Sequence, residues 1–187
     1  SLVKDAEHAV KEDQWDLDEK KYLEAIRLEP KHEKSYRGLG QVYLEKEELE
    51  EAKETYEFLT QLDEEDDFAY VKLAEISEQQ KNIEQAAEYY QKAVFINDSI
   101  SSRFTKLSDL LASTGESGAA LEAMQQAVEL EPKNPRYLDK LVERAIMCAD
   151  LEVAQEGYEK LRRVNPENEK LTTLKDKIEE LEQENNE

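Results

Sequence analysis

The feature that most constrains this chain is a pattern that returns at a constant interval of about 34 residues. Eight residues before the end of each repeat stands a large side chain, tyrosine in four repeats and methionine in one. Four residues earlier, four of the five repeats have alanine. The repeats end at Pro30, Glu64, Asp98, Pro132 and Pro166. A fixed period of this length indicates an array of one small structural unit stacked on copies of itself.

Within each repeat the apolar residues favour helices. They recur three, four and seven positions apart, which places them on one face of a helix in each half of the repeat. The alanines would let two helix backbones approach closely, and the large side chain four residues later would fill the space beside that contact. Glycine and proline number only five and four, so long irregular loops are not expected. Each repeat is therefore predicted to be an antiparallel helical hairpin.

On these residues the chain resembles the tetratricopeptide repeat, in which a large apolar residue, Leu-Gly, Tyr, Ala, an aromatic, Ala and Pro recur at the same offsets. The residues of the second repeat that match are Tyr36, Leu39, Gly40, Tyr43, Ala52, Tyr56 and Leu59. The resemblance implies an all-α fold, an α-solenoid in which antiparallel helix pairs form a right-handed superhelix.

The domain organisation follows from the register. We predict one domain over residues 1–187, with repeats at 31–64, 65–98, 99–132 and 133–166. Residues 1–30 are a divergent first repeat, with one short helix at Leu2, Ala6 and Ala9, a turn at Trp15, and a second helix through Tyr22. Residues 167–187 are predicted to form a C-terminal capping helix, followed by a frayed acidic tail. The apolar residues of that helix are Leu171, Leu174, Ile178 and Leu181.

Composition excludes several classes of partner. Asp and Glu number 46 and Lys and Arg 25, an excess of 21 acids, which disfavours nucleic acids and anionic membrane surfaces because both attract basic proteins. The single cysteine, Cys148, excludes an intrachain disulfide. No run approaches the ~20 apolar residues that span a bilayer. The chain starts without methionine inside a helical pattern, so we expect a soluble portion of a longer protein, either cytoplasmic or membrane-anchored.

Catalytic and metal-binding patterns are not found in the sequence. His8 and His32 lack metal-like spacing, and no phosphate-binding, dinucleotide-binding or nucleophile-elbow motif is present. The acidic run from Asp63 to Asp67 lacks the glycine of an EF-hand loop and is predicted to cap a helix. We expect neither a cofactor, a metal site nor catalytic residues.

One polar column is a candidate binding site. Lys72, Lys106 and Lys140 recur at the repeat spacing, and each is followed three residues later by an acid, namely Glu75, Asp109 and Glu143. The resemblance implies that these first helices line a concave groove, whose polar lining Lys34, Arg37, Gln41 and Arg136 would extend. The simplest interpretation is three ion pairs within single helices, each stabilising by a few tenths of a kcal/mol. The alternative is a basic ladder that binds a ligand.

The family's clamp for a C-terminal carboxylate is poorly matched. Gly38, Val71 and Thr105 occupy its positions, and its asparagines are missing. The acids that accompany the lysine column would oppose a carboxylate, so the resemblance does not extend to this clamp.

The function predicted from these observations is a non-catalytic scaffold that binds a peptide or protein partner in the groove, as a monomer rather than a homo-oligomer. Two alternatives stay open. The repeats could be the accessory domain of a membrane-anchored or multidomain protein, including an enzyme. They could also be a self-associating module, since the first repeat is irregular.

Overall fold

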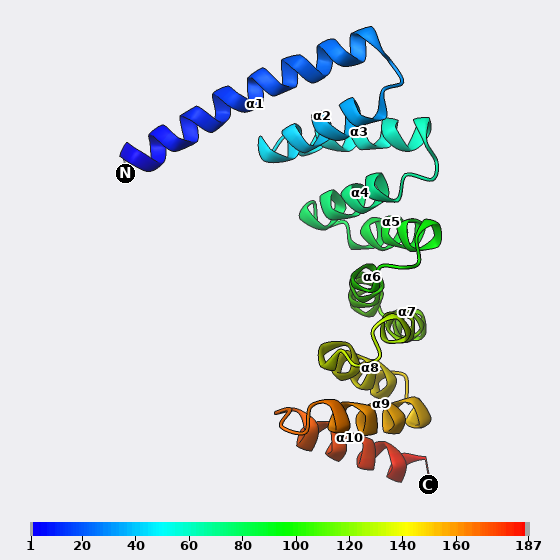
Figure 1. Cartoon of the computed structure of the whole chain (residues 1–187). Coiled ribbons are helices and arrows are strands. Elements are labelled where there is room, and N and C mark those ends of the chain that lie inside the picture. Colours follow the sequence, from blue (N-terminus) through cyan, green and yellow to red (C-terminus); the bar gives the residue numbers. More distant parts are fainter. Residues whose placement is uncertain (1, 186–187) are drawn as a thin grey trace. The chain divides into compact units, whose positions relative to one another are not determined.

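The computed structural model describes residues 2–185, with side chains from Gln14 onward, and all of its regular structure is helical (Figure 1). The helices are α1 (Leu2–Leu28), α2 (Glu33–Glu45), α3 (Leu49–Leu62), α4 (Asp67–Gln79), α5 (Ile83–Ile96), α6 (Ser101–Ser113), α7 (Ser117–Leu130), α8 (Pro135–Met147), α9 (Leu151–Val164) and α10 (Leu171–Glu184). The predicted all-α class built from helix pairs is confirmed. Across the described residues, no helix is both long and apolar enough to cross a membrane.

The chain divides into two compact units, Ser1–Asn82 and Ile83–Glu187. In the first unit, α2 packs against α1 and α3, and α3 packs against α4. In the second unit, neighbours in sequence pack from α5 to α10, and α10 also contacts α8. The assignment of all residues to a single domain stays a prediction.

The helix pairs are held by a large side chain against a very small one. A Cβ atom added to Gly40 in α2 would lie 2.6 Å from the ring of Tyr56 in α3, so only glycine admits this ring. Burial of the Tyr56 phenol raises its pKa. In the α6/α7 pair, the Ser108 hydroxyl donates to the backbone carbonyl of Ala120 at 2.7 Å, which is possible only because the two backbones lie close together. The four alanines of the small-residue column are all fully buried: Ala52, Ala86, Ala120 and Ala154.

The turns inside the repeats share one backbone motif. Each has a residue with positive φ at the repeat spacing: Glu47, Lys81, Gly115 and Ala149. At the first turn, the amide of Glu47 donates to Leu44 and the amide of Glu48 donates to Tyr43. This is the Schellman arrangement, which satisfies the last carbonyls of a helix. The same pair of bonds is found at the other three turns.

The first repeat is different, and the predicted pair of short helices with a turn at Trp15 is wrong. A single helix, α1, runs from Leu2 to Leu28, twice the length of the others (Figure 1). This stretch contains no glycine or proline. The Gln14 side-chain amide donates to both carboxylate oxygens of Asp18, four residues on, at 3.2 Å, which also favours a helix here. A straight helix also avoids the left-handed conformation, which costs a residue other than glycine about 1–2 kcal/mol.

The helix expected after Pro166 is α10, in which Leu174, Ile178 and Leu181 are buried. The predicted tail ends in residues 186–187, which lie outside the described residues, as do the side chains of Leu2, Ala6 and Ala9.

Local chemistry sets the start of several helices. Asp66 caps α4 by accepting from the amide of Ala69, as expected of the acidic run. Asn134 caps α8, and Pro135 occupies its first position, where a missing N–H costs nothing. Asp150 caps α9 through the amide of Val153.

The turn motif makes a paired prediction about stability. Gly115→Ala should lower the free energy of unfolding by about 1 kcal/mol, because alanine is strained at φ 88° while its methyl group would meet no atom within 4 Å. Ala149→Gly, at the same position of the next repeat, should raise it by about 0.5 kcal/mol, since relief of strain exceeds the added flexibility of the unfolded chain. Urea denaturation of both variants measures this. If both substitutions changed the free energy of unfolding in the same direction, the backbone strain assigned to a non-glycine residue at this turn position would be contradicted.

Candidate functional site

In the first unit, Arg37 of α2 is tied to the start of α4. Its guanidinium donates to one carboxylate oxygen of Asp66 at 2.8 and 3.1 Å, and it lies 5.4 Å from the ring centre of Phe68. The Asp66 side chain is fully buried, whereas that of Arg37 is 42% exposed. Arg37 therefore joins two repeats and compensates a buried charge, while one side of it faces solvent.

Lys72 in α4 has the partner expected from sequence. Its ammonium group donates to Glu75 at 2.8 Å and lies 5.5 Å from the same Phe68 ring that Arg37 contacts. Two cations thus lie near one aromatic ring. A cation within about 6 Å of the ring centre is attracted to the face of the ring. The predicted ion pair within α4 is confirmed.

In the second unit, the pair predicted between Lys140 and Glu143 is replaced by a network between α6 and α8. Lys140 does not pair with Glu143; it donates to Asp109 of α6 at 2.5 Å. Arg144 donates to the other oxygen of Asp109 at 2.9 Å and approaches the Ser108 hydroxyl at 3.4 Å. One carboxylate therefore lies between two cations from the following repeat.

Glu143 binds a residue that follows α9. Lys170 donates to Glu143 at 2.9 Å and also pairs with Asp139 at 3.0 Å. These bonds raise the pKa of Lys170, Glu143 having the larger effect. The other oxygen of Asp139 is buried without a hydrogen-bond partner.

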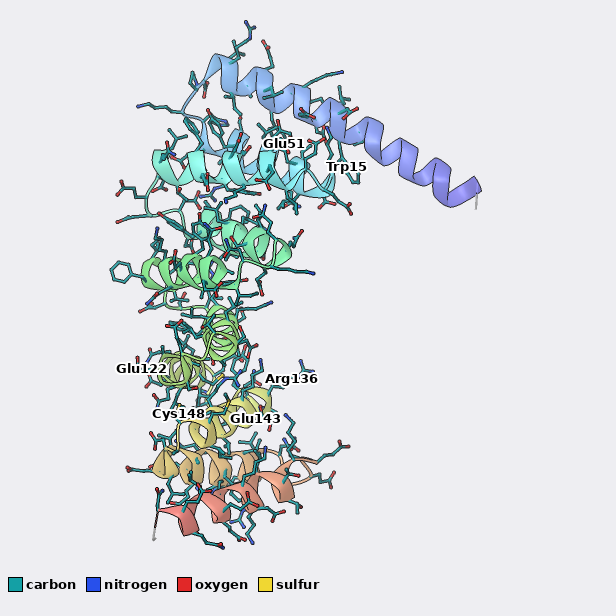
Figure 2. The ribbon with its side chains drawn as sticks, turned by 180° about the vertical axis from the view of Figure 1, so that it is seen from behind. Trp15, Glu51, Glu122, Arg136, Glu143 and Cys148 are labelled. Atoms are coloured by element: carbon teal, nitrogen blue, oxygen red, sulfur yellow. The ribbon has the colours of Figure 1, made fainter. Side chains whose placement is uncertain are left out.

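The remaining predicted residues are exposed. Lys34 and Gln41 project from α2, where the Gln41 amide donates to Glu45 at 2.8 Å. Lys106 is exposed on α6, and Arg136 is exposed on the first turn of α8 (Figure 2). These four side chains are exposed to solvent, whereas Arg37 and Lys140 join neighbouring repeats and Lys72 is bound within α4.

The helices of the second unit differ sharply in charge. Together α6 and α8 contain five basic and three acidic side chains, although the chain as a whole has 21 more acids than bases. By contrast, α7 contains two acids, Glu122 and Glu129, and no basic residue. The first helices of these two repeats therefore have a net positive charge, whereas α7 is acidic and α9, with three basic and three acidic side chains, is neutral.

Sequence reasoning missed three residues that make these contacts or lie beside them. Arg144 stands in a column that is apolar in the earlier repeats, as Val42, Ile76 and Leu110, so a charge there was a usable signal. Lys170 follows Arg136 by one repeat length. Met147 is 53% exposed beside Arg144, whose Nη1 lies 3.6 Å from its sulfur atom.

Sequence profiles of the tetratricopeptide repeat match residues 37–99 and 102–134, together about half of the chain. The chain is a tetratricopeptide repeat protein. The family is typically one of protein–protein interaction rather than catalysis. No curated protein matches the chain significantly in sequence.

Solved tetratricopeptide repeat structures have the same fold. One is YrrB, described as a tetratricopeptide repeat protein with an unusual peptide-binding site, with TM-score 0.67, 21% identity, and coverage of 91% of this chain and 88% of that one. MamA from Desulfovibrio magneticus RS-1 gives TM-score 0.64 at 15% identity, over 89% of this chain and 94% of that one. PilF from Pseudomonas aeruginosa gives 0.60 at 22% identity, over 83% and 71%. These likenesses establish the fold alone.

A metal site is not formed by the residues whose positions are described: no group of three or more His, Cys, Asp or Glu side chains converges among them. Cys148, at the end of α8, is partly buried, and this burial raises the pKa of its thiol.

The buried carboxylate of Asp66 provides a test of the first-unit network. Asp66→Ala removes the cap of α4 and the partner of Arg37, so the free energy of unfolding should fall by about 2 kcal/mol, roughly 1 of it from the cap. Glu64→Ala, an exposed acid in the same turn, should change it by less than about 0.5 kcal/mol. Denaturant titration of both variants gives the comparison. Similar small losses would mean that Asp66 does not hold α2 and α4 together.

Proposed function

We propose that this protein is a non-catalytic scaffold that binds a peptide or protein segment bearing acidic side chains on the α6/α8 surface. We define this surface by Lys106, Asp109, Arg136, Lys140, Arg144 and Met147. The observation that supports it is the charge difference: five basic against three acidic side chains on α6 and α8 in a strongly acidic protein. A local positive surface in an acidic protein favours an acidic partner.

The ion pairs of this surface leave positive charge available. Asp109 compensates only one of the two charges of Lys140 and Arg144. An incoming carboxylate would meet this excess together with the exposed Arg136. Because Lys140 and Arg144 are already held by bonds between repeats, little ordering of these side chains is needed on binding.

The exposed side chain of Met147 adds an apolar contact beside Arg144. A thioether adapts to differently shaped partners. The partner best suited to the surface is therefore a segment in which an apolar residue lies near an acidic one. YrrB, which shares the fold, is described as having a peptide-binding site, and this supports a peptide as the form of the partner.

In the first unit, Lys34 and Gln41 are exposed on α2, and Lys72 pairs with Glu75 on α4, so these residues are a separate candidate surface. The α2 and α4 helices hold no excess of basic residues, so we place the principal contacts on α6 and α8.

A random peptide library displayed on phage, panned against the protein, tests this proposal. Selected peptides should be enriched in Asp and Glu, and their affinity should fall as salt is raised, because charge pairs at an exposed surface are screened. Arg136→Glu should weaken a selected peptide tenfold or more, about 1.4 kcal/mol, in fluorescence anisotropy.

Arg163→Glu is the matched control, since Arg163 is an exposed arginine on the second helix α9. It should change the affinity by less than twofold. Equal losses from the two substitutions would show only an effect of net charge, and peptides without acidic residues would contradict the proposed chemistry.

A further inference from the structure

The long helix α1 combines two halves that have different counterparts in the other repeats. Its C-terminal half is in register with the second helix of a repeat: Tyr22 precedes Tyr56 by one repeat length. It also packs as one, because a Cβ added to Gly38 in α2 would lie 2.2 Å from the Tyr22 ring. The N-terminal half is in register with the first helix of a repeat. It does not fold back against the C-terminal half, but continues it as one straight helix.

The C-terminal half of α1 therefore lacks the first helix that covers its counterparts. Tyr22 and Ala25 are only partly buried, whereas the residues one repeat later, Tyr56 and Leu59, are completely buried. Leu17 and Leu23, on the same half, are 49% and 44% exposed. Among the described helices, α1 packs against α2.

The middle of α1 is fixed by one lysine. Lys46, at the end of α2, lies 3.1 Å from Asp16, 2.6 Å from Glu19 and 3.2 Å from Glu48. The opposite end of α1 leads directly to the start of α2. The residues before Gln14 thus reach about 18 Å beyond α2, at 1.5 Å per residue. In Figure 1 this end of α1 projects past α2 and α3.

The turn that would fold this end back is not formed. In the other repeats this turn contains a residue with positive φ, namely Glu47, Lys81, Gly115 or Ala149. The corresponding residue of the first repeat is Asp13, which lies inside helix α1. When the turn of a hairpin straightens, the detached half can cover the same site on a second copy, which is domain swapping.

We propose that two copies of this chain associate through an antiparallel pair of α1 helices. Residues 2–13 of each copy cover the C-terminal half of α1 in the other, and take the place of the missing first helix. The interface is two-fold symmetric, with its axis near Asp13, so each partly buried Tyr22 is covered by the α1 helix of the other copy. This association is independent of the α6/α8 surface and replaces the monomer expected from sequence.

The α6/α7 pair gives the geometry for a test. Ser108 and Ala120 contact each other there, and the residues at these two positions in the first repeat are Ala6 and Asp18. In a Cys148→Ala background, one chain carries Ala6→Cys and another carries Asp18→Cys. Within a swapped dimer these two cysteines come together only between chains.

Mixing the two variants under mild oxidation should give a disulfide-linked heterodimer, visible on a non-reducing gel, which neither variant forms alone. As a control, the second chain carries Lys20→Cys in place of Asp18→Cys. This places the thiol about 200° further around the helix, at an exposed position, and should abolish the disulfide-linked heterodimer. Light scattering of the unmodified chain should show a mass that rises towards twice the monomer with concentration.

Two results would overturn the proposal. A chain carrying both Ala6→Cys and Asp18→Cys that forms its disulfide internally, as a monomer, would show that α1 folds back on itself. If the mixture formed no heterodimer and the unmodified chain had a monomer mass at every concentration, the exposed half of α1 would not be covered by a second copy.

Discussion

The structure depends on the close approach of two helix backbones, permitted by a very small side chain beside a large ring. At Gly40 the ring of Tyr56 occupies the space that any Cβ would need. At Ala120 the backbone carbonyl comes near enough to bond the Ser108 hydroxyl. Because the small-residue column recurs in each of the four repeats after the first, the same packing is repeated along the chain and the central residues are inaccessible to solvent. A larger side chain at either position would overpack the pair and force it apart.

Charges have a second, more local role in each unit. Arg37 reaches Asp66 in the next repeat, and Lys140 and Arg144 reach back to Asp109 in the previous one. These bonds fix which side chains stay on the surface and in which orientation. The bonds of Lys140 and Arg144 to Asp109 also lie on the two helices in which basic residues outnumber acids, so the network that joins these repeats creates the surface on which binding is proposed.

Much of the fold could be predicted from sequence because the buried columns are periodic, and one constant interval specifies helix, turn and helix together. The exception, α1, could not, since a straight helix and a hairpin place the same residues on the same faces and differ only in the conformation of the turn around Asp13. For the site, spacing predicted the pair of Lys72 and Glu75 but not that of Lys140 and Asp109. Spacing along one helix identifies neighbours three or four residues apart, whereas the flexible lysine side chain bonded a carboxylate 31 residues away in the preceding repeat.

The central claim is that the first helices of the second unit, and not its second helices, contact the partner. Amide hydrogen exchange measured by mass spectrometry, with and without a saturating peptide, tests this most directly. Added protection should concentrate at the start of α8 and along α6, around Lys106 and Arg136, and leave α7 and α9 unchanged. Protection confined to α7 and α9 would place the partner on the opposite helices and contradict the account.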